Sequence, residues 1–405
     1  MDKCARRGNF AETTIKVNAE MIHVDTVAPE TRIASLTTPS LVLDAKRMRH
    51  NVARLKDHLK SLGVPLRPHL KTAKSIEIAR LLMETPEGPA TVSTLKEAEQ
   101  FAAAGVRDIL YAVGISPAKL SRVVELRRQG INISVILDSR EQAEAVAAAS
   151  RAAKDPIPVL IEIDSDGHRA GIKPGAKLLT EVGFVLHKRG AELRGVMTHA
   201  GGSYNKSGAE AHAADAEQER AAAVACAEQL RNAGFPCPVV SVGSTPTALF
   251  TKDLTGVTEV RAGVFAFMDL VMAGIGVCTV DDIALSVLAT VIGHQKDRGL
   301  ILVDAGWMAM SQDRGTSSQA VDQGHGIVCR VNGRPYTDLI MSRANQEHGL
   351  LSLRPGSTAE LPYLEVGAQV SILPNHACST AAQFDRYHVA ADYIVTDVWP
   401  RFSGW

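Results

Sequence analysis

The stretch ATVSTLKEAEQFAAAGVRDILYAV, residues 90–113, decides how we interpret the fold of this chain. It begins with a short run rich in β-branched residues at 90–94. An amphipathic helical pattern follows at 95–105, and a second strand-like run at 108–113. A strand, a helix and a strand in this order are typical of α/β folds, in which helices cover a parallel sheet. The stretch therefore predicts a parallel sheet whose strands are joined by helices.

The same alternation continues on both sides of this stretch. An opening strand at 40–44 and a helix at 45–62 come first. Eight strand candidates follow, at 66–70, 90–94, 108–113, 132–138, 158–164, 193–199, 239–245 and 258–263. Because most of them are separated by one amphipathic helix, they predict a (β/α)8 barrel. A doubly wound open sheet is the alternative, and it is disfavoured because no Gly-rich dinucleotide turn follows the first strand.

The pattern changes after about residue 276. Strand-like runs are then separated by turn residues with almost no helical pattern between them, at 283–294, 299–306, 326–331, 368–374 and 393–399. We therefore expect an N-terminal arm at 1–37, a barrel at 38–275 and a second, mainly β domain at 276–405. The opening strand at 40–44 precedes the barrel, which makes it a candidate to pair with the β domain.

Composition excludes several classes of function. A chain of 405 residues is too long for one ordinary core, so two domains are expected. Lys+Arg and Asp+Glu both number 44, which argues against a nucleic-acid or membrane-surface partner, and no apolar run could span a bilayer. The polar N-terminus does not resemble a secretory signal, although a transit peptide is an alternative. Six scattered cysteines fit reduced thiols and a cytoplasmic location.

Polar and titratable residues follow the predicted barrel strands, where barrel active sites lie. They are His69, Lys71, Asp164, Asp166, His168, Arg169, Thr198, His199, Tyr204, Gly243, Ser244, Thr245, Arg261, Gly263 and Val264. The loops after the last two strands combine glycines with hydroxyl side chains, which suits a phosphate group. A phosphate opposite Lys71 suggests a phosphorylated cofactor held as a Schiff base. The spacing alone leaves open two ordinary Gly-rich turns and a surface lysine.

The string RPHLKTAK at 67–74 resembles the cofactor-lysine motif of fold-type III pyridoxal-phosphate (PLP) enzymes, the alanine-racemase-like group. Within this group the chain resembles the D-threo-3-hydroxyaspartate dehydratase and D-serine dehydratase family, to which D-threonine aldolase is related. Each supporting string is weak alone, but together they keep the family order from residue 38 to about 400. They are TPSLVLD, STLKEAEQF, EIDSDGHRAG, THAGGSY, VGSTPT, EVRAGVFAFMD, VDAGWMAM, NQEHG and PNHAC.

The resemblance implies PLP as the cofactor and a head-to-tail homodimer. With it, Lys71 is expected to carry PLP, and the phosphate to sit at Gly243, Ser244, Thr245, Gly263 and Val264. Arg169 is expected to face the phenolic oxygen of the cofactor or the substrate carboxylate. His199 is a candidate to pack on the PLP ring, or only to bind strand-end backbone. Tyr204 is a candidate partner of the pyridine nitrogen or the substrate.

The segment PNHACST places His376 and Cys378 two residues apart. On a strand they would face one side and could share one Zn²⁺, with water and substrate as further ligands. Mn²⁺ or Mg²⁺ are alternatives if those ligands are oxygens. The pair alone favours a core cysteine beside a surface histidine. The resemblance reverses this, since dehydratases of the family carry His-x-Cys as a metal site. Glu347 and His348, in NQEHG, are either groups near the metal or an ordinary turn.

The expected activity is dehydration of a D-β-hydroxy amino acid to a 2-oxo acid and ammonia. A Lewis acid lowers the cost of expelling hydroxide, Lys71 can take the α-proton, and PLP absorbs charge. The resemblance favours threo-3-hydroxy-D-aspartate (to oxaloacetate), then D-serine (to pyruvate). A D-threonine aldolase is the main alternative, but its family pattern has Asp where Cys378 stands. A PLP-binding protein without turnover is disfavoured by the β domain, and a racemase by the lack of a second base.

Overall fold

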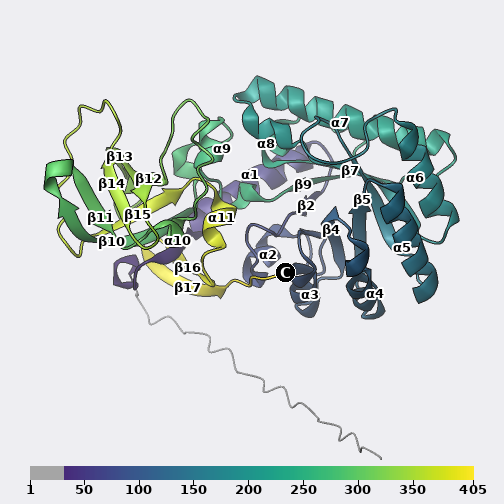
Figure 1. Cartoon of the computed structure of the whole chain (residues 1–405), viewed down its shortest axis with the longest axis horizontal. Helices are drawn as coiled ribbons and strands as arrows, with labels where there is room; N and C mark the ends of the chain where they lie inside the picture. Colours follow the sequence, from purple (N-terminus) through teal and green to yellow (C-terminus); the bar gives the residue numbers. More distant parts are fainter. Residues whose placement is uncertain (1–31) are drawn as a thin grey trace, which may run out of the picture.

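Eight parallel strands form the first sheet of the computed structural model, which describes residues 32–405 (Figure 1). They follow the order β2-β9-β8-β7-β6-β5-β4-β3, and a bridge between His69 and Thr91 joins the two ends of the sheet. This closed arrangement confirms the predicted barrel. The strands are β2 (Leu66–Pro68), β3 (Ala90–Val92), β4 (Asp108–Gly114), β5 (Asn132–Leu137), β6 (Pro158–Ile163), β7 (Glu192–Thr198), β8 (Val239–Val242) and β9 (Glu259–Ala262).

Helices start directly after several of these strands because capping side chains stand at the strand ends. The Thr94 hydroxyl accepts the Glu97 N–H at 3.0 Å at the start of α3, and Ser139 does the same for Gln142 in α5. The carboxyl ends of the strands and their loops therefore gather at one face. The helices of this part are α1 (Ala45–Ser61), α2 (Ile76–Leu82), α3 (Leu95–Ala103), α4 (Leu120–Arg128), α5 (Arg140–Ala153), α6 (Lys177–Lys188), α7 (Ala209–Asn232), α8 (Thr245–Phe250) and α9 (Leu270–Gly274).

A nine-stranded, mainly antiparallel sheet forms the second part of the chain. Strand β1 (Ser40–Asp44) belongs to this sheet, where it pairs antiparallel with β10 and parallel with β16. The short helices α10 (Trp307–Met310) and α11 (Ala377–Ala381) interrupt the strands. The other strands are β10 (Leu285–Gln295), β11 (Leu300–Val303), β12 (Gly326–Cys329), β13 (Pro335–Ala344), β14 (Gly349–Leu353), β15 (Gln369–Pro374), β16 (Arg386–Ala391) and β17 (Ile394–Pro400).

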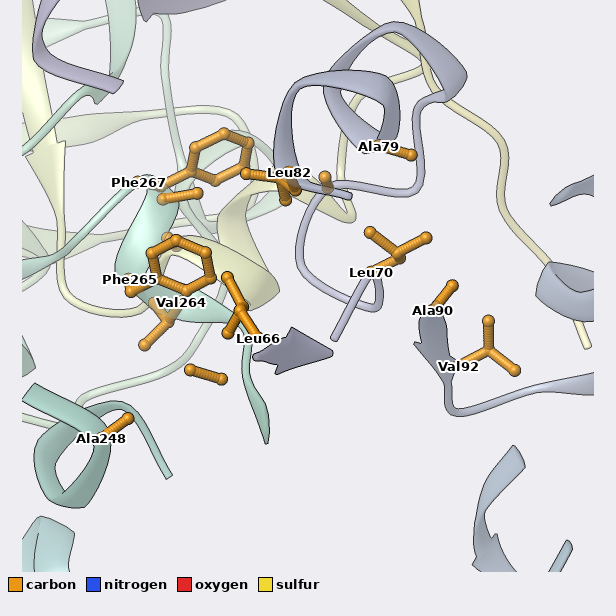
Figure 2. Close-up of a cluster of buried hydrophobic side chains, with 14 of the residues drawn as sticks. Leu66, Leu70, Ala79, Leu82, Ala90, Val92, Ala248, Val264, Phe265 and Phe267 are labelled. Atoms are coloured by element: carbon orange, nitrogen blue, oxygen red, sulfur yellow. The ribbon is translucent and has the colours of Figure 1, made fainter. Parts of the chain in front are cut away.

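Buried apolar side chains surround the segment that carries Lys71. Figure 2 shows Leu66 beside Val264 and Phe265, which follow strand β9, and Leu70 on the side of Ala90 and Val92 of β3. Leu70, Phe265 and Phe267 are completely buried. The same hydrophobic cluster continues into the nine-stranded sheet, so both parts of the chain share one core. Such packing holds the start of the Lys71 loop in one position.

The C-terminal residues of the chain lie against the barrel, beside α2 and α3 (Figure 1). The Phe402 N–H donates to the Lys74 carbonyl at 3.0 Å, and its ring packs edge-on against Phe101 of α3. The Tyr387 hydroxyl of β16 donates to the Ala73 carbonyl at 2.6 Å. The β domain therefore fixes the far side of the Lys71 loop.

Most of the predicted N-terminal arm, residues 1–31, lies outside the described residues. The remainder begins with an isolated bridge from Arg32 to Ile394 and a short 3₁₀ turn at Ile33–Ser35. Within residues 32–405, none of the helices is long and apolar enough to cross a membrane.

Candidate active site

A cavity of about 810 Å³ lies at the carboxyl ends of the barrel strands, between the barrel and the β domain. Asp313, which follows α10, and residues at the start of α11 contribute to its wall. The structure brings together all the residues that sequence analysis assigned to a cofactor or a metal. They are Lys71, Arg169, His199, Tyr204, Gly243, Ser244, Thr245, Gly263, Val264, His376 and Cys378.

Lys71 extends from a loop whose backbone is tied down on both sides. The Leu70 N–H donates to the Thr91 carbonyl at 2.8 Å, and the Lys74 N–H donates to the Leu70 carbonyl at 2.9 Å. Thr72 is almost completely buried, whereas the Lys71 side chain is exposed to the cavity. Among the described residues, no carboxylate forms an ion pair with its amine. The loop therefore presents an amine that is free to react.

Cations and two histidines surround Lys71 at the barrel end of the cavity. Burial, followed by the nearby Lys71 ammonium, lowers the pKa of His199 to about 3. Burial and the charges of Lys71 and Arg261 hold the pKa of His69 well below its usual value. Both imidazoles are therefore neutral at ordinary pH, and His199 donates from Nδ1 to the Gly243 carbonyl at 3.0 Å. Arg261 is buried and donates from Nε to Ser241 Oγ at 2.9 Å.

The loops after β8 and β9 have the features of a small anion site. Gly243 has φ of +134°, and a Cβ there would lie 2.1 Å from the Arg261 carbonyl oxygen, so a side chain does not fit. The buried Thr245 hydroxyl has no hydrogen-bond partner in the described part of the chain. A buried unpaired hydroxyl beside a glycine turn fits a phosphate oxygen. The Gly243 N–H itself donates to Glu219 Oε1 at 3.0 Å. Gly243 therefore leaves room for a phosphate close to its backbone, but its own N–H is not available to donate to that phosphate.

Arg169 and Tyr204 frame the same end of the cavity. Arg169 forms an ion pair with Glu162 at 3.3 Å, and its side chain is 56% exposed. It is therefore both a surface residue and a cavity residue. Burial, with a smaller contribution from Cys378, raises the pKa of Tyr204 above its usual value. The phenol stays protonated and can donate a hydrogen bond.

His376 and Cys378 reach the cavity by a different local structure from the one predicted. His376 is the residue that precedes helix α11, and Cys378 lies in its first turn, so the pair does not lie on a strand. The chain turns from β15 into α11 at this point. Both side chains reach one site because of this turn, and not because they alternate along a strand. The buried Asp269 carboxylate fixes the turn by accepting the Ala377 N–H at 3.0 Å.

Neighbouring polar groups orient both side chains. His376 donates from Nδ1 to Asp313 Oδ2 at 2.7 Å, which leaves Nε2 for a ligand. Burial would lower the pKa of His376, but Asp313 and Cys378 together raise it. Burial would raise the pKa of the Cys378 thiol, but the neighbouring His376 lowers it. Cys378 Sγ also lies 3.1 Å from the hydroxyl of Thr72, the residue next to Lys71.

An imidazole nitrogen and a thiolate are donors that Zn²⁺ prefers. Within residues 32–405 they are not joined by a third His, Cys, Asp or Glu in ligand geometry. Any metal here would therefore need water or substrate to complete its coordination. Glu347 and His348 lie in the exposed turn between β13 and β14 and do not line the cavity, which agrees with the interpretation as an ordinary turn.

Four residues of the site were not predicted from sequence: Thr72, Glu219, Asp269 and Asp313. Thr72 lies in the motif string RPHLKTAK, and Asp269 lies in EVRAGVFAFMD. Their position in these strings was the one sequence feature that could have identified them. Asp313 lies in an irregular segment after α10, and Glu219 lies within an Ala-rich helix. For these two, no local pattern indicates which group they approach.

Known proteins show the same organisation. Residues 43–271 match the family described as alanine racemase, N-terminal domain, and residues 284–390 match the putative serine dehydratase domain. The chain is 51% identical over 376 residues to D-threo-3-hydroxyaspartate dehydratase of Delftia sp. (strain HT23), covering 92% of this chain and 99% of the relative. It is 29% identical to D-serine dehydratase of Dictyostelium discoideum, covering 88% and 94% of the two chains.

Solved structures agree with this relationship. The structure of the Delftia sp. HT23 dehydratase has a TM-score of 0.90 and 50% identity, and the match covers 93% of this chain and 100% of that one. A second structure of the enzyme, with the same scores and coverage, is described as a cysteine-to-alanine mutant in the metal-free form. D-threonine aldolase from Filomicrobium marinum gives a TM-score of 0.76 at 26% identity, covering 92% and 96%.

Proposed function

Because the chain belongs to the family of D-threo-3-hydroxyaspartate and D-serine dehydratases with the alanine-racemase fold, we propose that it is a PLP- and divalent-metal-dependent dehydratase. Its proposed substrate is threo-3-hydroxy-D-aspartate, which would give oxaloacetate and ammonia, with D-serine as the second choice. One observation carries the proposal: the Lys71 amine and the His376–Cys378 pair line the same cavity, and Thr72 links their two segments.

The barrel end of the cavity fits PLP. Bound PLP supplies an electron sink for the charge that develops at the α-carbon of an amino acid. Lys71 would hold it covalently, and the unpaired Thr245 hydroxyl, with Ser244, Gly263 and Val264, would bind its phosphate. Arg169 would face the phenolic oxygen of the cofactor or the substrate carboxylate, and Tyr204 the pyridine nitrogen or the substrate. The neutral His199 ring is available to pack on the plane of the cofactor ring. Two cations that line the cavity, the exposed Lys71 and the buried Arg261, favour an anionic ligand at this end.

Lys71 is also the proposed base. Once its amine is released from the cofactor, Nζ can accept the α-proton of the substrate. The loop around Lys71 is held by buried neighbours, so we propose that Nζ would approach the substrate from one side. This geometry implies strict stereospecificity. The choice of the D enantiomer comes from the names of the relatives and not from the geometry.

We propose that His376 and Cys378 hold a divalent metal. Such an ion supplies a Lewis acid that lowers the cost of expelling the β-hydroxyl group. Zn²⁺ is favoured because imidazole and thiolate are its usual donors, whereas Mn²⁺ or Mg²⁺ would require mostly oxygen ligands. The Asp313 hydrogen bond, which directs Nε2 of His376 into the cavity, supports this role. The description of a relative's cysteine mutant as metal-free supports it further.

We further propose a cytoplasmic homodimer. Cys226, Cys237, Cys278, Cys329 and Cys378 are all free, which fits a reducing compartment. The dimer rests on the family resemblance alone. Light scattering coupled to size-exclusion chromatography would test it, with a mass close to twice 43.3 kDa expected and a monomer contradicting it.

A retro-aldol activity is the second candidate, because a D-threonine aldolase of Arthrobacter sp. is 29% identical over 92% of this chain. Cys378 favours dehydration, since the aldolase pattern has Asp at this position. The deciding experiment measures ammonia and aldehyde release from both 3-hydroxy-D-aspartate diastereomers, D-serine, D-threonine and the L enantiomers. Ammonia from the threo-D-hydroxyaspartate at the highest kcat/KM is expected. Aldehyde plus glycine would identify an aldolase, and turnover of L enantiomers alone would overturn the site assignment.

A further inference from the structure

A buried carboxylate lies between helix α7 and the barrel strands, behind the loops that face the cavity, and it feels the charge of Arg261 without forming an ion pair with it. Glu219 belongs to α7, which covers β7 and β8, and only 2% of the residue is exposed. Among residues 32–405, no lysine, arginine or histidine forms an ion pair with it. Burying such a group is unfavourable unless hydrogen bonds replace its water. The position of its hydrogen bonds therefore indicates what the residue does.

All the hydrogen bonds of Glu219 go to two loops of the cavity. Oε1 accepts the Ala200 N–H at 2.9 Å, after β7, and the Gly243 N–H at 3.0 Å, after β8. Oε2 accepts the Thr247 hydroxyl at 2.7 Å, in the first turn of α8. One carboxylate thus joins both loops from behind.

The groups next to these contacts face the cavity. Ala200 follows His199, whose ring donates to the Gly243 carbonyl at 3.0 Å. Thr247 forms a reciprocal capping box with Ser244, and Ser244 Oγ also lies 3.0 Å from Ser203 Oγ. Glu219 therefore holds the Gly243 peptide directly and is linked to the Ser244 hydroxyl through Thr247, and Thr245 is the residue next to Ser244.

We propose that Glu219 is a positioning residue for the phosphate end of the cofactor, a role that rests on the proposed function. It fixes the loops after β7 and β8 in the conformation that receives the phosphate group. It does not line the cavity, and it acts through the loops proposed to receive the phosphate, so its effect should be larger for ligands that carry a phosphate. Pyridoxal, which lacks that group, is the matched probe.

The test titrates apoprotein with PLP and with pyridoxal and compares the two dissociation constants in each variant. Glu219→Leu removes the acceptor of two buried N–H groups, and we expect PLP affinity to fall about tenfold or more while pyridoxal affinity changes little. Glu219→Gln keeps one oxygen as the acceptor of both N–H groups and presents an amide to Thr247. The ratio of its dissociation constants for PLP and pyridoxal should therefore stay near that of the wild type. Thr247→Val removes the third contact of Glu219 together with the hydrogen bonds of the Thr247 hydroxyl to Ser244, so it should also weaken PLP binding more than pyridoxal binding.

Cys226→Ala is the control for general loss of stability, because Cys226 is buried on the same helix but does not line the cavity. It should lower the thermal midpoint without changing the ratio. Equal loss of both ligands in Glu219→Leu and Thr247→Val, or no loss in either, would overturn the positioning role. Wild-type protein that binds PLP no better than pyridoxal would overturn the proposed phosphate site, and the role of Glu219 with it.

Discussion

The two ends of the cavity shift the pKa of histidine in opposite directions. At the barrel end, burial and the Lys71 ammonium lower the pKa of His199 to about 3. At the β-domain end, Asp313 and Cys378 outweigh burial and raise the pKa of His376 above its usual value. Neutral rings beside Lys71 and Arg261 leave a site for an anion. The Cys378 thiol, whose pKa is lowered by His376, and the Asp313 carboxylate favour a cation beside His376. We therefore call the part of the cavity near Lys71 and Arg261 the proposed cofactor end, and the part near His376, Cys378 and Asp313 the proposed metal end.

The two ends also differ in burial. Ser244 and Thr245, at the cofactor end, are no more than 2% exposed. The side chains of His376 and Asp313, at the metal end, are 40% and 31% exposed. The loop that carries Ser244 and Thr245 is thus part of the core, whereas the proposed metal end is accessible to solvent and to chelators. We expect the cofactor to persist under conditions that remove the metal.

The largest effect should come from Lys71→Ala. Loss of the amine removes both the covalent hold on the cofactor and the proposed base, so activity should fall by about 10³-fold or more. Borohydride treatment of the wild-type protein should fix the cofactor on the peptide that contains Lys71, as shown by mass spectrometry. Label on Lys74 would place the cofactor elsewhere, although that amine already pairs with Glu97 at 3.2 Å.

Removal of the metal should have the next largest effect. Chelation, or His376→Ala, should reduce ammonia release by about 10²-fold or more, because the β-hydroxyl then leaves without a Lewis acid. PLP should stay bound, as followed by its absorbance, since none of the residues proposed to hold PLP is a proposed metal ligand. Activity that survives exhaustive chelation would remove the metal from the mechanism. Loss of PLP during chelation would show that the two ends are not independent.

The sequence predicted the cofactor end better than the metal end, for a physical reason. Carboxyl ends of parallel strands meet at one face, so recognising the strands was sufficient to place Lys71, His199 and Gly243 in one cavity. His376 and Cys378 were recognised by motif, but their turn into α11 was mistaken for a strand. Asp313 lies 63 residues from His376, and no local pattern could pair them.

Strands of the β domain were missed for a related reason. Strand β13 contains a register shift between Met341 and Arg343, and Asp338 within it has a positive φ. Such irregularities break the alternation of apolar and polar residues by which strands are recognised. Barrel strands are short and buried on both faces, so continuous apolar runs reveal them.

Asp313→Asn should lower the metal affinity of the His376 site without changing the PLP affinity. An amide can still accept the His376 N–H but carries no charge, so we expect about a tenfold loss of metal affinity. Competition of the protein with a chromophoric chelator would measure it, and PLP affinity should not change. Asp322→Asn is the control, because it removes another carboxylate near the same segment that pairs with Arg314 and does not line the cavity. An equal loss in both variants would show that general charge, and not the His376 contact, is responsible.

The smallest expected effect is a change in the stability of the folded protein at acidic pH. The pKa of His199 lies at about 3 in the folded protein and at about 6.5 in an unfolded chain, so the unfolded state binds the extra proton first as the pH falls. The contribution of His199 to stability is therefore present above pH about 6.5 and is lost progressively below it. His199→Gln removes this titration while keeping a donor for the Gly243 carbonyl. The stability advantage of wild type over this variant should be smaller at pH 5.5 than at pH 7.5 by at most about 1.4 kcal/mol. Urea unfolding of the apoprotein at both values measures it. A difference that does not change with pH would mean that His199 is not held neutral, and the contrast in histidine pKa between the two ends of the cavity would then lose its support at the barrel end.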